Sequence, residues 1–161
     1  MNRLFELFYR SIKNTFLLAC FVFLLCTLKI FAQSGEKLEI ETSCALQHKV
    51  GTEEFLSCVS VRLTGLENYK AIIASYDEGH KLQKSFSFCE RQWGVIWELI
   101  SECANTQIFS YERIPSIIRI VPENYGEASI VDCESEWRPQ YDMIELCVID
   151  EIEYWFSKNS N

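Results

Sequence analysis

Cysteine is the residue type with the clearest chemical potential in this sequence. Six cysteines form three couples whose members stand fourteen positions apart: Cys44 and Cys58, Cys89 and Cys103, Cys133 and Cys147. In an oxidising compartment such thiols form disulfides, whereas in a reducing one they bind metal or act as nucleophiles. Whether the six cysteines are expected to form disulfides therefore depends on whether the chain is exported to an oxidising compartment.

Other residues offer little catalytic chemistry. Cys44 and His48 stand four positions apart, so they could bind zinc from one face of a helix. Two ligands are only half of the set that a zinc site needs. Paired acids such as Asp150 and Glu151 can hydrolyse glycosides, yet such runs are typical of a solvated face. GxSxG, HExxH, EF-hand and phosphate-loop motifs are missing. We predict no catalytic, cofactor-binding or metal-binding residues; a hydrolase that uses His48 or His80 is the least favoured alternative.

The first 34 residues are typical of a secretory signal peptide. Basic residues precede the apolar run FLLACFVFLLCTL, and small residues follow it. This run spans only about 20 Å as a helix, whereas a bilayer core requires about 20 residues. We expect cleavage after Ala32 or Ser34, which gives a secreted, extracellular chain with no stable membrane insertion. The alternative is a type II membrane protein with an uncleaved signal anchor, because residues 30–32 could extend the span.

Removal of residues 1–34 leaves the six paired cysteines, because the other two of the eight lie in the apolar run. An even number in an exported chain indicates disulfides. Residues 35–157 suffice for a single domain with a core, and we expect residues 158–161 to form a frayed tail. The remaining 11 basic and 22 acidic residues give a net charge of about −11. This charge argues against nucleic acid as a partner and favours solubility or attraction to a basic partner.

Apolar residues in the three cysteine windows follow the period of amphipathic helices. From Leu82 to Cys103 they recur at steps of four and three residues. The window after Cys133 continues in the same way to Trp155, and the window after Cys44 does so more weakly. Nine positions after each first cysteine stands an acidic residue: Glu53, Glu98 or Asp142. We predict that core packing, more than a ligand pocket, accounts for the aromatic residues on the stripe.

These patterns predict an all-α fold, a disulfide-stapled bundle of about four to five helices. One short strand or irregular segment is expected around residues 108–131, where Pro115 and Pro122 flank the β-branched run SIIRIV. Residues 58–65, CVSVRLTG, also alternate as a strand would. A further short helix is expected from Leu66 to Tyr76.

The pairing of the cysteines depends on whether each window is one helix. An unbroken helix would hold its two cysteines about 21 Å apart, whereas a disulfide needs a Cα separation of about 4.4–6.8 Å. Gly51 and Pro139 provide breaks, so local pairs are open to the first and third windows. The middle window has Gly94 near its centre but the most regular period. We expect it to stay helical and to bond to neighbouring elements.

The six cysteines, each in an amphipathic segment after a signal peptide, resemble the small cysteine-stapled helical domains of secreted nematode proteins. One such family is a domain of unknown function. The resemblance covers about residues 43–148 and implies a helical disulfide-bonded fold with no assigned activity, although those domains commonly carry eight cysteines. Some related domains lie on chondroitin-bearing proteins, and Ser34 begins an acid-flanked Ser-Gly sequence like a glycosaminoglycan attachment site.

The sequence therefore predicts a secreted, non-enzymatic binding or interaction protein without a cofactor. Its partner is expected to be an unknown extracellular protein. The alternative function is an extracellular carrier of small apolar ligands, which the aromatic stripes would line.

Overall fold

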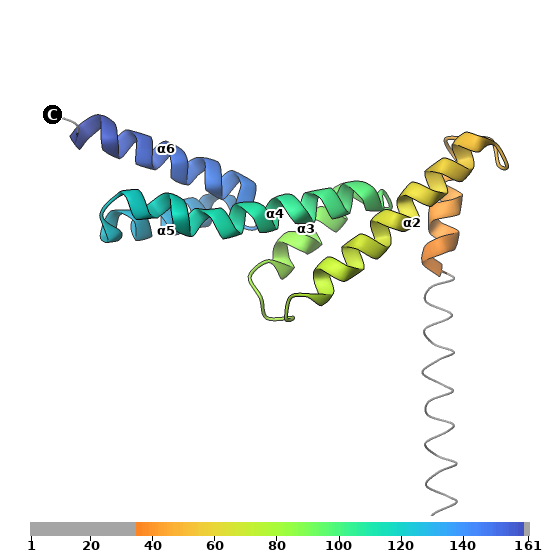
Figure 1. The fold of residues 1–161 in the computed structure, drawn as a ribbon, viewed down its shortest axis with the longest axis horizontal. Helices are drawn as coiled ribbons and strands as arrows, with labels where there is room; N and C mark the ends of the chain where they lie inside the picture. Colours follow the sequence, from red (N-terminus) through yellow and green to blue (C-terminus); the bar gives the residue numbers. More distant parts are fainter. Residues whose placement is uncertain (1–34, 160–161) are drawn as a thin grey trace, which may run out of the picture. The chain divides into compact units, whose positions relative to one another are not determined.

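The computed structural model describes residues 35–159 (Figure 1). The chain forms two compact units, Met1–Ser43 and Cys44–Asn161. Of the first unit only residues 35–43 are described, and they are helical. The predicted signal peptide, with its cleavage sites, lies outside the described residues. All further observations concern the second unit.

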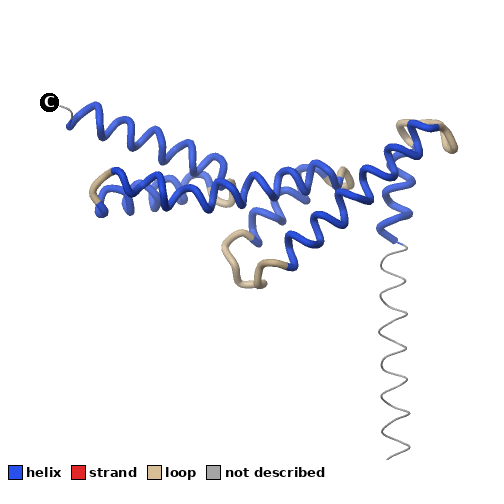
Figure 2. Tube along the Cα trace, viewed as in Figure 1, coloured by secondary structure: helices blue, strands red, loops and turns tan. Residues whose placement is uncertain are grey.

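Helices make up almost all of the second unit. Residues 44–45 are helical, and they are followed by α2 (Glu53–Ala74), α3 (Gln83–Trp93), α4 (Trp97–Ile117), the 3₁₀ helix η1 (Ile118–Ile120), α5 (Glu123–Trp137) and α6 (Tyr141–Asn159). Figure 2 shows only helices and loops among residues 35–159, so the all-α prediction is confirmed. No helix within this range is long and apolar enough to cross a membrane. α6 continues into the residues that were expected to fray.

α4 is the central helix of this unit. It packs against α2, α3 and α6, while α5 packs against α6 and η1 (Figure 1). The core contains the apolar stripes predicted from the sequence: Leu82, Phe86, Cys89, Ile100, Cys133, Tyr141, Ile144, Val148 and Ile152 are all buried. Tryptophans on or beside these stripes are partly buried and pack against the same core.

α2 and α4 cross in close contact at Gly65. A Cβ atom at this position would lie 2.3 Å from the backbone nitrogen of Glu98 and 2.6 Å from the carbonyl carbon of Trp97. Such distances are far below van der Waals contact, so only glycine fits between the two backbones. The lower helix propensity of glycine is therefore offset by the close packing that it permits.

α2 includes two segments for which the sequence suggested other structures. The strand-like residues 58–65 and the expected short helix from Leu66 onward both lie in this one helix. Thr52 caps it, since its side-chain oxygen accepts a hydrogen bond from the Phe55 nitrogen at 3.3 Å. Its buried residues stand at positions i, i+3, i+4 and i+7, the pattern of one helical face: Arg62, Gly65, Leu66 and Tyr69. The helical period therefore prevails over the short alternation, and residues 58–65 form no strand.

Residues 108–131 are also helical except close to Pro122. α4 continues to Ile117, η1 follows directly, and α5 begins at Glu123. Pro115 lies in the last turn of α4, and Pro122 immediately precedes α5, where a missing N–H removes no helical hydrogen bond. The run SIIRIV therefore belongs to a helix end, and the irregular segment is limited to residues 121–122.

All three cysteine couples form local disulfides. The Cα atoms of Cys44 and Cys58 are 6.0 Å apart, and those of the other two pairs are 5.8 Å apart. The chain leaves the helical conformation between the members of each pair, at residues 46–52, 94–96 and 138–140. The local pairs that the sequence left open for the first and third windows are therefore confirmed.

The prediction for the middle window is wrong, because Cys89 bonds to Cys103. α3 ends at Gly94, whose φ of +57° favours glycine, and α4 starts three residues later. Both helices turn their apolar faces to the same core, and three residues are close to one helical turn. The apolar period therefore continues from α3 into α4 without interruption, so the period alone does not reveal that the chain reverses at residues 94–96.

The contact at Gly65 can be tested by substitution. We expect Gly65→Ala to lower the free energy of unfolding by at least about 2 kcal/mol, since the helices must separate to accept a methyl group. Gly79→Ala is the matched control, because nothing lies within 4 Å of a Cβ atom at that position. Urea denaturation measures both. Similar stability of the two variants would contradict the close crossing.

The local disulfides can be tested by removal of one bond at a time. Replacing both cysteines of a pair by serine should lower the free energy of unfolding by about 3 kcal/mol for a loop of this size. Peptide mass spectrometry without reduction should yield three linked peptide pairs, one per window. A peptide that links two different windows would refute the observed pairing.

Candidate functional site

The six predicted cysteines serve structural bonds. The sulfur of Cys44 is bonded to Cys58, so it is not a thiolate that could bind zinc together with His48. Among residues 35–159, no group of three or more His, Cys, Asp or Glu side chains is arranged to hold a metal ion. The chemistry of this part of the chain therefore depends on its other side chains.

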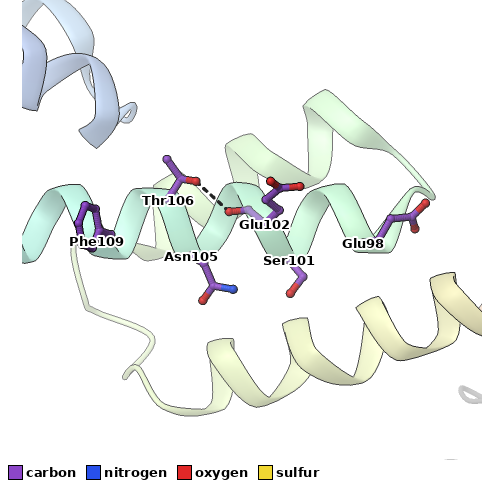
Figure 3. A pocket seen from close by; sticks show the side chains of 6 residues that line it. All are labelled: Glu98, Ser101, Glu102, Asn105, Thr106 and Phe109. Atoms are coloured by element: carbon purple, nitrogen blue, oxygen red, sulfur yellow. Dashed lines mark hydrogen bonds between the residues drawn. The ribbon is translucent and has the colours of Figure 1, made fainter.

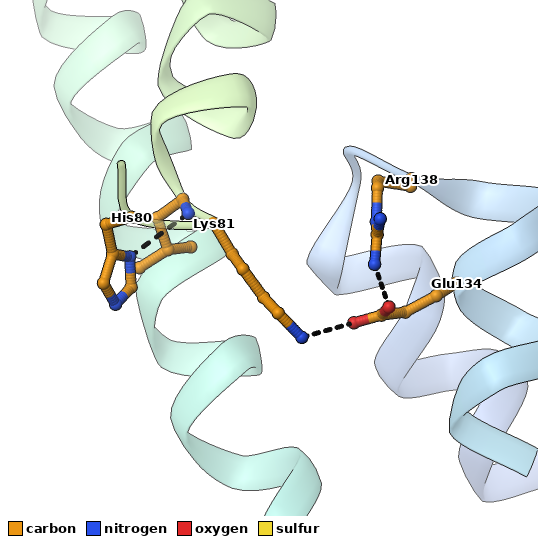
Figure 4. Close-up of polar contacts among 5 residues, drawn as sticks. His80, Lys81, Glu134 and Arg138 are labelled. Atoms are coloured by element: carbon orange, nitrogen blue, oxygen red, sulfur yellow. Dashed lines mark hydrogen bonds and ion pairs between the residues drawn. The ribbon is translucent and has the colours of Figure 1, made fainter. Parts of the chain in front are cut away.

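His80 packs between two tyrosines. Its ring centroid lies 4.9 Å from that of Tyr76 and 5.5 Å from that of Tyr111. The backbone nitrogen of Leu82 donates a hydrogen bond to Nδ1 of His80 at 3.2 Å, just before α3 begins (Figure 4). These contacts assign the His80 ring to packing and to the start of α3.

Polar contacts join the start of α3 to the turn between α5 and α6. Lys81 forms an ion pair with Glu134 of α5 at 3.6 Å, and Glu134 also pairs with Arg138 (Figure 4). The buried Ser85 hydroxyl donates to the carbonyl oxygen of Pro139 at 2.6 Å. These bonds hold the start of α3 against the third disulfide-closed turn.

Gln107 of α4 fixes the first turn of α6. Its side chain is 2% exposed. Its Oε1 accepts a hydrogen bond from the backbone nitrogen of Tyr141, and its Nε2 donates to Oδ1 of Asp142 at 2.9 Å. The amide thus satisfies one of the free N–H groups at the helix start and orients a carboxylate next to it.

Three open pockets adjoin one another along α4. The turn pocket is bounded by the loop before α2 and by α2 itself, and its lining includes His48, Glu53, Glu54, Arg62 and Glu98. The central pocket, shown in Figure 3, is lined by Glu98, Ser101, Glu102, Asn105, Thr106 and Phe109. The Trp93 pocket lies among α3, α4 and the start of α6, and its lining includes Trp93, Glu102, Thr106 and Asp142.

Neighbouring pockets share lining residues. Glu98 lines both the turn pocket and the central pocket, while Glu102 and Thr106 line both the central pocket and the Trp93 pocket. Figure 3 shows Ser101 and Asn105 pointing from α4 toward α2, with Thr106 bonded to the Glu102 carbonyl on the other edge. We call these three neighbouring pockets together the groove, and α2, α3, α4 and α6 all contribute residues to it.

Carboxylates dominate the charge of this groove. Five of its lining residues are acidic: Glu53, Glu54, Glu98, Glu102 and Asp142. A backbone N–H and the Thr52 hydroxyl hold the pKa of Glu54 below its usual value. Arg62 is the one lysine or arginine among the described residues of the lining, and its Nε lies 4.0 Å from Oε1 of Glu98. The groove can therefore attract cationic groups.

Three of these acids occupy equivalent places in the chain. Glu53, Glu98 and Asp142, which stand nine positions after the first cysteine of each window, lie in the first turns of α2, α4 and α6. A helix N-terminus favours negative charge, which explains why all three positions hold an acidic residue. The sequence alignment of the windows thus indicated three of the five acids of the groove, although it did not show that these three line neighbouring pockets.

Two tyrosines have strongly raised pKa values because they are buried. Tyr69 donates a hydrogen bond to Glu90 at 2.7 Å, and its pKa is raised by burial and by that bond. Burial, together with the charge of Glu134, raises the pKa of Tyr141 to about 12. Within the described residues no group accepts a hydrogen bond from the buried Tyr141 hydroxyl. Both shifts thus follow from burial and from a nearby carboxylate.

The chain matches no family model, no curated protein and no solved structure. The resemblance to secreted nematode domains therefore stays a prediction.

The two tyrosines should respond oppositely to loss of the hydroxyl. At pH 7 we expect Tyr141→Phe to keep or raise the free energy of unfolding by about 1 kcal/mol, because it removes a buried polar group without a partner. Tyr69→Phe should lower it by about 1 kcal/mol, because Glu90 loses its donor. Denaturation curves measure both, and equal losses would contradict this assignment.

A raised tyrosine pKa also fixes the sign of the pH dependence. The folded chain holds the Tyr141 proton up to a pKa of about 12, while an unfolded tyrosine releases it near the ordinary tyrosine pKa of 10.0. Stability should therefore fall as the pH rises from 10 to 12, and the fall should be smaller in Tyr141→Phe.

Proposed function

We propose that this chain is a secreted, non-enzymatic binding protein that engages an extracellular partner along the groove on α4. The observation that supports this most is the presence of three neighbouring open pockets over helices that disulfides and polar side-chain bonds hold in place. A surface that is preformed in this way loses little conformational entropy when a partner binds.

Secretion is supported by the disulfides. Three bonds within residues 44–147 are typical of chains that fold in an oxidising compartment. This agrees with the signal peptide predicted for residues 1–34. A type II membrane protein with an uncleaved signal anchor would expose the same helical unit to the same compartment.

The polar lining favours a protein partner over a small apolar ligand. Carboxylates and amides surround the pockets, and burying them against an apolar molecule would remove their water without providing hydrogen bonds. Trp137 and Trp155 pack against the core and do not line these pockets. The carrier hypothesis is therefore the weaker one.

Expression of the full chain in a eukaryotic cell tests the secretion. We expect the product in the medium. Its intact mass should be that of a chain that starts at Gln33 or Gly35, and it should be lower than the mass of the reduced chain because of the three disulfides. A chain retained in the membrane fraction at full length would instead favour the signal anchor.

Two assays of the secreted product test its activity. We expect no turnover of lipid, peptide or glycan substrates, and saturable binding of the immobilised chain to an extracellular protein. Reduced and alkylated chain is the control, and it should lose binding because the groove loses its supports. Hydrolysis of any substrate by the purified chain would refute the proposal.

A further inference from the structure

The Trp93 pocket combines aromatic and carboxylate groups in one concavity. Three apolar side chains line it: Phe88 and Trp93 from α3, and Leu99 from α4. All three are partly buried, and the Cys89–Cys103 disulfide joins the two helices behind them. Aromatic faces attract flat cations, and they do so more strongly where water is partly excluded.

Two carboxylates occupy the same pocket. Glu102 comes from α4 and Asp142 from the first turn of α6. Gln107 holds Oδ1 of Asp142 at 2.9 Å, which orients the carboxylate. No ion pair among residues 35–159 involves either acid, and no Lys or Arg lines this pocket. Both negative charges are thus available to a cation from outside.

We propose that the Trp93 pocket is the binding site for an arginine side chain of a basic partner protein. This inference rests on the proposed binding function and names the chemistry of the partner. A guanidinium stacks on aromatic rings and bonds carboxylates with two parallel N–H groups, whereas a lysine ammonium is a compact, strongly hydrated charge. The amides of Gln92 and Gln140 at the same pocket can accept further N–H groups.

The rest of the groove favours a basic segment around that arginine. Glu53 and Glu54 of α2, which line the turn pocket, add negative charge farther along the groove, where Glu98 already pairs with Arg62. A net charge of about −11 for residues 35–161 strengthens attraction at long range and repels anionic surfaces. Charge complementarity therefore selects a cationic polypeptide over a nucleic acid or an acidic lipid surface.

Calorimetric titration of the secreted chain with short synthetic peptides tests the proposal. The probe is a capped Gly/Ser peptide with three arginines, at about 0.15 M salt, where distant charges are screened. Two peptides of the same sequence, with lysine or with neutral, isosteric citrulline for arginine, are the controls. We expect the arginine peptide to bind at least tenfold more tightly than the citrulline peptide and several-fold more tightly than the lysine peptide. Equal affinities for the three, or no binding, would overturn the proposal.

Variants in which a single carboxylate is replaced by its amide test whether arginine binds in the Trp93 pocket. Glu102→Gln and Asp142→Asn should each weaken the arginine peptide about tenfold, because each removes one carboxylate from the pocket. The amide introduced by Asp142→Asn keeps an oxygen that can accept from Gln107, so the fold should persist, and an unchanged thermal midpoint checks this. Glu153→Gln is the matched control, since it removes the same charge from an exposed position of α6 outside the groove. Equal weakening by all three variants would show attraction by overall charge and would overturn the site.

The same variants separate this inference from the proposed function. If Glu102→Gln and Asp142→Asn leave binding to the extracellular partner intact, the arginine site is wrong while the binding function stands. If the wild-type chain turns over a substrate, the binding function is wrong whatever the peptides do. Loss of partner binding in both variants, with the Glu153→Gln control unaffected, supports both.

Discussion

Three short covalent loops constrain the course of the chain. Each disulfide holds at 5.8–6.0 Å two Cα atoms that an unbroken helix would separate by about 21 Å. The helix must therefore end and reverse between them. Because the second cysteine of each pair comes within two turns of a helix start, each reversal places that helix start beside a cross-link. The acids Glu53, Glu98 and Asp142 occupy these starts, so the acidic groove follows from the placement of the bonds.

The helices assemble around α4 through one close crossing and a few specific polar bonds. Gly65 lets α2 contact the backbone of α4 near its start. Two residues of α4 contact α6. Gln107 accepts a hydrogen bond from the first turn of α6, and Arg113 forms an ion pair with the buried Glu145 at 3.0 Å. These contacts involve different parts of α4 and leave its outer face uncovered. The groove is thus the surface that remains when a central helix is packed against three neighbours.

The sequence was sufficient for the fold class because the apolar period of a helix is long and regular. It predicted the apolar stripe that begins at Leu82, in which Phe86 and Ile100 are buried. It failed at Gly94, since two antiparallel helices with one common core continue a single period across a three-residue turn. The strand suggested by SIIRIV failed because short β-branched runs also occur at helix ends.

The candidate site was harder to predict than the fold. The acids had a signal, because their spacing from the cysteines repeats. The other residues of the Trp93 pocket had none: Phe88, Leu99 and Gln140 come from three different elements and meet only after the chain has reversed twice. The periodicity of a sequence identifies the buried face of one helix at a time. A pocket is lined by residues from several elements, and their proximity depends on how those elements pack together.

The local pairing of the cysteines has a consequence for biosynthesis. A chain that crosses a membrane N-terminus first delivers its cysteines in order, and in this fold each second cysteine arrives fourteen residues after its correct partner. Six cysteines permit 15 pairings in a fully synthesised, unfolded chain. During emergence, however, a newly arrived second cysteine meets one unpaired thiol if earlier pairs have closed. If the chain is secreted as proposed, the order of translocation favours the native connectivity, because each second cysteine first meets its correct partner.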